Sequence, residues 1–164
     1  MNNSPLVSIN IPVYKCEDYI YRCLESVVNQ TYQNIEIILV NDCTPDNSIS
    51  IIEDFIQKHN DFDIKLIHHK ENGGLSVVRN TGIENSNGEY IYFLDSDDDI
   101  TNDCIEKLVK NALENDTEMV IAQNRWINTF DNSTKDYGFA TNFSKLIFLD
   151  NFSIFKAYCE GSFP

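Results

Sequence analysis

The sequence predicts an α/β fold in which a mainly parallel sheet is flanked by helices. Short apolar segments of strand length alternate with segments whose apolar residues recur at helical spacing, from residue 7 to about residue 123. One short segment, residues 35–40, is almost wholly apolar, as expected for a strand covered on both faces. Ligands of such sheets collect at the carboxyl ends of the strands, so functional residues are expected there.

The elements follow in a regular order. Residues 7–13 alternate apolar with polar side chains and indicate a strand, and residues 20–28 carry apolar side chains on one helical face. The pattern then predicts a strand at 35–40, a helix around 51–56, a strand at 64–67, a short helix at 77–84, a strand at 90–94, a helix at 105–113 and a strand at 119–122.

The pattern degrades after residue 123. Residues 128–143 are rich in turn-forming side chains and are predicted to be an exposed loop, and residues 146–158 restore an apolar, helix-like segment. The sequence reaches residue 164 without a closing element, so we expect a fold truncated at its C-terminus. The predicted division is a core at 1–123 and an incomplete second region at 124–164.

Composition excludes several classes of protein. The chain carries 26 acidic against 12 basic residues, a formal net charge of −14, so it would repel nucleic acid. Its five cysteines form no CxxC pair and no zinc spacing, which favours reduced thiols in the cytoplasm. The N-terminus has no signal-peptide pattern and no apolar run approaches the roughly 20 residues of a membrane span. We expect a cytoplasmic protein, with peripheral attachment to the inner face of the membrane as a second option.

Four carboxylates in five positions follow the predicted strand at 90–94: Asp95, Asp97, Asp98 and Asp99. They repel one another, and a shared cation would relieve that repulsion at the ligand-binding edge of the sheet. The alternative on composition alone is a solvated acidic turn that caps the next helix.

A calcium loop is a second alternative for the same segment. Five acidic residues match the first, third, fifth, ninth and twelfth places of an EF-hand, namely Asp95, Asp97, Asp99, Asp103 and Glu106. However, Ile100 stands at the sixth place, where the sharp turn requires glycine, and a strand precedes the loop instead of a helix. These two departures disfavour a calcium site.

Two further residues lie at predicted strand ends. Asp42, just past the second strand, can accept a hydrogen bond from a base or ribose, or can serve as an Asx-turn residue. Arg79, after the Gly73-Gly74 pair, can bind phosphate or a base carbonyl, or can offset the acidic crevice. Each signal is weak alone, but Asp42, Arg79 and the acidic segment are expected along one edge of one sheet.

The motifs together resemble family 2 glycosyltransferases of the GT-A fold. The resemblance rests on VSINIPVY at 7–14, CLESV at 23–27, NQTY at 29–32, EIILVND at 36–42, NGGLS at 72–76, Arg79-Asn80 with Gly82, and GEYIYFLDSDD at 88–98. It covers about residues 6–123 in consistent order, which makes it specific for the family.

The resemblance implies which residues bind a nucleotide-diphosphate sugar, UDP- or GDP-linked. The implied nucleotide-binding residues are Pro12, Val13, Tyr14, Asp42, Arg79, Asp95 and Ser96, with the first three lining the base pocket and Asp42 holding the base. Asp95-Ser96-Asp97 is the implied DxD motif. Asp97 is the expected ligand of Mg²⁺ or Mn²⁺, and Asp95 is expected to touch ribose or the metal, which supplies positive charge that this acidic chain lacks.

The chain departs from the family pattern at a few points. Cys43 and Pro45 replace the usual Gly-Ser-Thr run after Asp42, and Val78 stands where alanine is common. The family's catalytic base lies on a later segment, which we expect beyond Pro164. Asp150 and Glu160 match no family motif.

The implied function is metal-dependent, inverting transfer of a sugar to an unknown glycan or lipid-linked acceptor, by analogy in bacterial surface polysaccharide synthesis. The alternative is a nucleotide-binding module without turnover; a third class is a calcium-binding or interaction domain. We also expect apolar surface at Trp126, Phe148 or Phe155 to support self-association.

Overall fold

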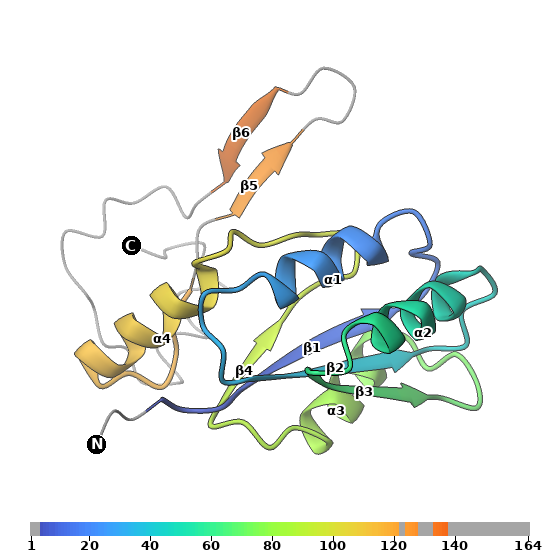
Figure 1. Cartoon of the computed structure of the whole chain (residues 1–164), viewed down its shortest axis with the longest axis horizontal. Helices are drawn as coiled ribbons and strands as arrows, with labels where there is room; N and C mark the ends of the chain where they lie inside the picture. The colour runs from blue at the N-terminus through green and yellow to red at the C-terminus, as the bar shows by residue number, and fades with distance from the viewer. Residues whose placement is uncertain (1–3, 122–123, 128–132, 138–164) are drawn as a thin grey trace, which may run out of the picture. The chain divides into compact units, whose positions relative to one another are not determined.

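The computed structural model describes residues 4–121, 124–127 and 133–137 of the chain. The chain separates into two compact units, Met1–Asp116 and Thr117–Pro164, which are treated separately below (Figure 1). Within the described ranges, none of the helices is long and apolar enough to cross a membrane.

The first unit is a four-stranded sheet in the order β3-β2-β1-β4, with every neighbouring pair parallel. Its strands are β1 (Val7–Val13), β2 (Ile35–Asn41), β3 (Asp63–His68) and β4 (Tyr90–Phe93). Its helices are α1 (Ile20–Val28), α2 (Ser48–Lys58), α3 (Leu75–Glu84) and α4 (Cys104–Asn115). The α/β prediction for this region is therefore confirmed.

The two faces of the sheet carry different layers because successive strand residues point to opposite sides. One face packs against α1, α2 and α4 through a large apolar core that includes Ile9, Ile37 and Phe55. The other face packs Ile38 and Val40 against α3 in a smaller cluster. Figure 1 shows α1 and α2 on one side of the sheet and α3 on the other.

The α3 face also buries a polar network near the amino ends of the strands. Glu36 accepts hydrogen bonds from Ser8 Oγ (2.6 Å), Lys65 Nζ (2.8 Å) and the Asn87 main-chain N–H (2.6 Å) and side chain (3.0 Å). Burial alone would raise the pKa of Glu36, but the bonds from Lys65, Ser8 and Asn87 outweigh it and lower the pKa to about 2. Glycine is required at Gly88, because a Cβ there would lie 2.6 Å from the Ser8 main-chain nitrogen.

The second unit contains an antiparallel pair, β5 (Asn124–Ile127) and β6 (Thr134–Tyr137). β6 corrects the prediction of an exposed loop at 128–143; it was missed because its sequence, TKDY, offers no apolar face, and its order comes from main-chain pairing.

The predicted strand at 119–122 is also wrong for its described residues, 119–121. The Met119 and Ile121 side chains are 63% and 53% exposed, so this short apolar run is not buried against a partner sheet or helix. The predicted helix at 146–158 lies outside the described residues.

Candidate functional site

A cavity of about 290 Å³ lies at the carboxyl ends of β1 and β4 and the start of α3. It is lined by Pro12, Tyr14, Lys15, Cys16, Tyr19, Leu75, Asp95, Ser96 and Asp97. The cavity therefore unites the segment after β1 with the acidic segment after β4, two regions some 80 positions apart in the sequence. This is the edge at which ligands of parallel sheets bind.

Hydrogen bonds join the loop after β1 to the loop after β2 beside the cavity. The Lys15 N–H donates to Thr44 Oγ1 (2.7 Å) and the Glu17 N–H to Asp46 Oδ2 (3.0 Å), while Glu17 Oε2 accepts from the Asn47 N–H (2.9 Å). Lys15 has a φ of 52°, which lets the chain reverse sharply after the strand. These bonds fix the rim from which Tyr14 and Lys15 meet the cavity.

The rim presents aromatic and apolar surface to the cavity. Tyr14 and Tyr19 are each 44% exposed, and Leu75 at the first turn of α3 is also exposed. The Lys15 ammonium lies 5.3 Å from the centroid of the Tyr14 ring. A planar ring can stack on such a surface while a cation stands near its edge.

The acidic segment supplies another part of the cavity lining, through Asp95, Ser96 and Asp97. A turn bond joins the Asp98 N–H to the Asp95 carbonyl (3.0 Å). Burial and then the neighbouring charges of Asp97, Asp95 and Asp99 raise the pKa of Asp98 above its ordinary value. Within the described residues, the Asp97 carboxylate makes no hydrogen bond or ion pair, although it lines the cavity.

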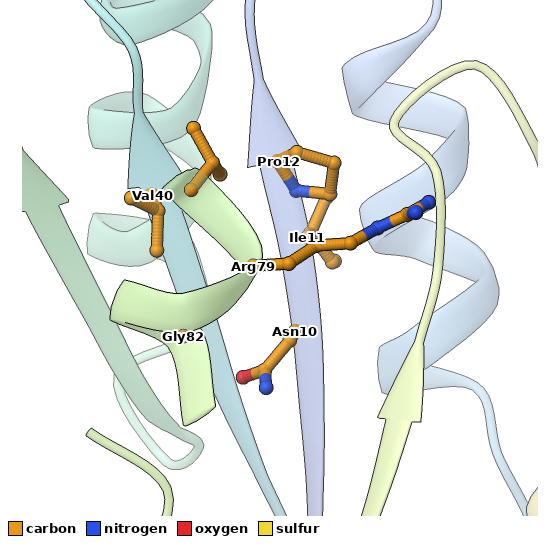
Figure 2. Close-up of a pocket in the computed structure, with 7 residues that line it drawn as sticks. Asn10, Ile11, Pro12, Val40, Arg79 and Gly82 are labelled. Carbon is orange, nitrogen blue, oxygen red and sulfur yellow. The ribbon is translucent and has the colours of Figure 1, made fainter. Parts of the chain in front are cut away.

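Arg79 reaches the acidic segment from α3. Figure 2 shows its side chain leaving the helix and crossing in front of β1, past Pro12 and Ile11. Arg79 Nη2 donates to Asp95 Oδ1 (2.9 Å), and the guanidinium carbon lies 5.8 Å from the centroid of the Phe93 ring. The hollow under this side chain has no volume for a water molecule, so Arg79 covers packed residues and does not line a second ligand site.

Asp42 has different surroundings from those expected of a base ligand. Its side chain is buried and is absent from the cavity lining. Oδ1 accepts from the Gly73 N–H (2.8 Å) and contacts His69 Nδ1 (3.0 Å), and Oδ2 accepts from the Gly74 N–H (2.8 Å). Burial opposes ionisation, but the bonds from Gly73, His69 and Gly74 outweigh it and lower the pKa of Asp42.

Asp42 thus holds the turn that starts α3, which resembles the Asx-type role considered from the sequence more than a base contact. Val13 is likewise fully buried, and its neighbours Pro12 and Tyr14 form the lining. The lining residues Lys15, Cys16, Tyr19 and Leu75 were not predicted. The available signal was their position between β1 and α1, and directly after the glycine pair in the case of Leu75.

The acidic segment fits a metal held jointly with a phosphate ligand. In the described part of the chain, no three His, Cys, Asp or Glu side chains converge into a preformed cage. Magnesium bound with a nucleotide takes only one or two protein carboxylates, the rest of its shell being phosphate and water. Among the described residues, the Asp97 carboxylate has no partner and Asp95 pairs with Arg79, so these two acids match that requirement.

The EF-hand alternative is excluded by the geometry. A strand, β4, precedes the acidic segment where an EF-hand needs a helix. Asp103 pairs with Lys107 (2.6 Å) and Glu106 accepts from Thr31 Oγ1 (2.7 Å), so neither turns toward a shared ion.

Comparison with known proteins identifies relatives over nearly the whole chain. The family model for glycosyl transferase family 2 matches residues 8–160. The uncharacterized glycosyltransferase EpsJ of Bacillus subtilis is 46% identical over 116 residues, which are 71% of this chain and 33% of that protein. Hyaluronan synthase of Pasteurella multocida is 36% identical over 129 residues, which are 78% of this chain and 13% of that enzyme.

Solved structures share the fold. S. aureus TarS residues 1–349 in complex with UDP has a TM-score of 0.61 at 28% identity, over 66% of this chain and 32% of the 1–349 chain. The mannosyltransferase PcManGT from Pyrobaculum calidifontis, in complex with GDP-Man and Mn²⁺, has a TM-score of 0.65 at 23% identity, over 68% of this chain and 33% of that one. The chain thus spans about a third of the length of these structures and of EpsJ.

Proposed function

The chain belongs to glycosyl transferase family 2 and has its GT-A fold, and from this premise we propose that it binds a nucleotide-diphosphate sugar and that the protein transfers the sugar to an acceptor hydroxyl. One observation carries the proposal. The 290 Å³ cavity joins an exposed aromatic rim to the unpaired carboxylate of Asp97 at the ligand-binding edge of the sheet.

The proposed orientation follows from the chemistry of the two walls. The base stacks on the Tyr14 side beside Pro12, and the diphosphate lies toward Asp95, Ser96 and Asp97. A bound Mg²⁺ or Mn²⁺ supplies the positive charge that lets a diphosphate approach these acids and stabilises it as a leaving group. Arg79, 2.9 Å from Asp95, offsets that carboxylate and stands at the nucleotide edge.

Two features of the relatives support this reading. TarS was solved with UDP, and PcManGT with GDP-Man and Mn²⁺, so proteins of this fold hold such donors. For this chain, we propose that transfer depends on the metal and inverts the configuration at the anomeric carbon of the sugar. We further propose a glycan or lipid-linked acceptor in surface polysaccharide synthesis, since hyaluronan synthase is among the relatives.

The proposed location is the cytoplasm, or the inner face of the membrane. Within the described residues, Cys16, Cys23, Cys43 and Cys104 are all free thiols, as is usual in a reducing compartment. No contact in the second unit bears on self-association, because the Phe148 and Phe155 positions and the Trp126 side chain lie outside what is described.

Calorimetric titration tests the metal-linked donor site. We expect UDP or GDP to bind much more tightly with Mn²⁺ than without it, since metal and diphosphate complete each other's surroundings. Asp97→Asn is expected to remove this difference. Asp103→Asn is the matched control, because Asp103 pairs with Lys107 outside the cavity, and should retain it. Equal nucleotide affinity with and without metal in the unsubstituted chain would exclude the proposal.

Transfer assays separate an enzyme from a binding module without turnover. The chain is assayed with several nucleotide sugars alongside any longer version of the gene product. Donor binding without transfer by residues 1–164, with transfer by the longer protein, supports a catalytic base outside this sequence. Transfer by residues 1–164 alone would locate the base within them, with Asp150 and Glu160 the first positions to substitute.

A further inference from the structure

Side chains of α1 and of the residues just after it contact main-chain atoms of the acidic segment and of the residues that follow it. Cys23 and Ser26 lie three residues apart on one face of α1, and Gln30 follows four residues later, just past the end of the helix. Cys23 Sγ lies 3.7 Å from the Asp95 carbonyl oxygen, and Ser26 Oγ accepts from the Ile100 N–H (3.2 Å). Both contacts are with main-chain atoms.

Gln30 makes the largest set of these contacts. Its side chain is only 2% exposed, and both ends of its amide are used. Nε2 donates to the carbonyls of Thr101 (2.8 Å) and Ser26 (2.9 Å), while Oε1 accepts from the Ile105 N–H (3.0 Å). One buried amide therefore joins the end of α1 to the exit of the acidic segment and to the first turn of α4.

The bond to Ile105 meets a need of α4. The first N–H groups of a helix have no partner within the helix and require an acceptor from outside. Asp103, the residue before α4, makes no side-chain capping bond to the helix and pairs with Lys107 instead. Gln30, two residues past the end of α1, supplies the missing acceptor for the first turn of α4.

The acidic segment needs such support because its own side chains repel one another. Arg22, from α1, adds two weaker contacts at an exposed position. Its Nη2 lies 3.3 Å from the Asp97 carbonyl oxygen, and its Nε lies 3.6 Å from Asp99 Oδ2. Exposed pairs of this kind contribute little, whereas a buried, fully bonded amide holds its partners firmly.

We propose that Gln30 is a positioning residue that sets the location of the acidic segment, so that Asp95 and Asp97 meet the metal and diphosphate together. The inference rests on the proposed donor site. Gln30 touches neither ligand; it acts through Thr101 and Ile105, which bound the segment on its C-terminal side. Groups hydrogen-bonded directly to a metal ligand typically change metal affinity about 10- to 100-fold when they are substituted. Gln30 acts one step further out, so we expect an effect at the low end of that range.

The test variant is Gln30→Met, which keeps the length of the side chain and removes all three hydrogen bonds. Ser26→Ala removes one bond to the acidic segment, from the Ile100 N–H, together with the local bond from Ser26 Oγ to the Cys23 carbonyl, and provides a graded variant. Ser8→Ala is the matched control. It also removes buried hydrogen bonds, to Glu36 and from the Gly88 N–H, but at the opposite end of the strands.

Three quantities are measured on each variant of residues 1–164. Calorimetry gives the ratio of UDP affinities with and without Mn²⁺ and the affinity for uridine, which carries no phosphate. Hydrogen exchange gives the protection of the Ile105 amide. We expect Gln30→Met to lower the affinity ratio about tenfold and Ser26→Ala to lower it less, with uridine binding unchanged. Ser8→Ala should leave the ratio unchanged.

The outcomes separate this inference from the proposed function. A ratio of one in the unsubstituted chain removes the metal site, and the role of Gln30 with it, before any variant is compared. If the unsubstituted ratio is large and Gln30→Met retains it, although Ile105 loses protection, then Gln30 is merely structural and the inference is wrong. Equal loss of UDP and uridine binding in Gln30→Met would also overturn it.

Discussion

The Glu36 carboxylate and the carboxylates of the acidic segment lie toward opposite ends of the strands, and their surroundings are opposite in character. Glu36 is buried near the amino ends of the strands, and four hydrogen bonds occupy its oxygens. Asp97 stands exposed at the carboxyl ends and, within the described residues, lacks such partners. The pKa of Glu36 is lowered, whereas that of Asp98 beside Asp97 is raised.

The difference distinguishes an acid that holds the fold from one that is available to a ligand. A carboxylate whose lone pairs are all accepted by protein donors has little capacity for anything else. Asp42 tests this distinction, because it lies at the carboxyl end of β2 and yet resembles Glu36 in burial and bonding. Position along the sheet alone therefore does not identify a ligand-binding acid.

The largest expected effect is at Glu36. Glu36→Gln should lower the free energy of unfolding by about 3–5 kcal/mol, because it leaves Lys65 without its charge partner and places an amide N–H against N–H donors. Urea unfolding followed by circular dichroism measures it. A loss below about 1 kcal/mol would show that the network is not structural.

A pH series separates the charge of Glu36 from its shape. Its pKa falls from 4.5 to about 2 on folding, so its stabilisation is complete above pH 4.5 and is lost as the pH falls toward 2. That shift corresponds to about 3 kcal/mol. The stability difference between the unsubstituted chain and Glu36→Gln should therefore shrink across this window, and a difference independent of pH would contradict the assignment.

Asp42 should behave as a weaker form of Glu36. Asp42→Asn removes one acceptor from the Gly73-Gly74 turn and should lower the free energy of unfolding by about 1–2 kcal/mol. If Asp42 instead holds the base, stability will change little, and nucleotide binding will weaken by about 1–3 kcal/mol while metal-bound pyrophosphate is unaffected. Parallel unfolding and calorimetry decide between the two roles.

Cys43, the residue after Asp42, allows a test of how much the backbone conformation of this loop costs in stability. It adopts a φ of 56°, a left-handed conformation that costs a non-glycine residue about 1–2 kcal/mol. Cys43→Gly should relieve this strain, lose the contact of Sγ with the His69 carbonyl (3.1 Å), and raise the free energy of unfolding by about 0.5–1 kcal/mol. Cys43→Ala is the control: it loses the contact, keeps the strain and should not stabilise.

The smallest effect is expected at Asp97. Because its carboxylate lacks a protein partner in the described part of the chain, Asp97→Asn should change the free energy of unfolding by less than about 0.5 kcal/mol. A loss as large as that at Asp42 would place Asp97 among the structural acids and would remove the distinction drawn above.

Much of the first unit could be predicted from sequence because its elements carry strong local patterns. The apolar run of β2 and the helical spacing of Ile20, Cys23 and Leu24 specify their structures whatever surrounds them. β6 could not be predicted in this way, since the sequence TKDY acquires its order only by pairing with β5. The prediction at Met119–Ile121 failed for the opposite reason: the run is apolar, as in a buried strand, but its Met119 and Ile121 side chains remain exposed.

The candidate site was predicted better in its residues than in their roles. Pro12, Tyr14, Asp95, Ser96 and Asp97 do line one cavity. The partners of Asp42 could not be foreseen, because Gly73 and Gly74 reach it from about 30 positions away and no side-chain pattern marks a main-chain donor. Gln30 was likewise hidden, since its two long-range partners are main-chain atoms of Thr101 and Ile105.

The attachment of the acidic segment has a consequence for how this site can diversify. Cys23, Ser26 and Gln30 contact carbonyl oxygens and N–H groups, which every residue except proline provides. Substitutions at Ser96, Asp98 or Asp99 therefore leave that attachment intact. Side chains that face the cavity can therefore change during evolution while Cys23, Ser26 and Gln30 keep the segment in place. New ligand preferences can arise in this way without a change of fold.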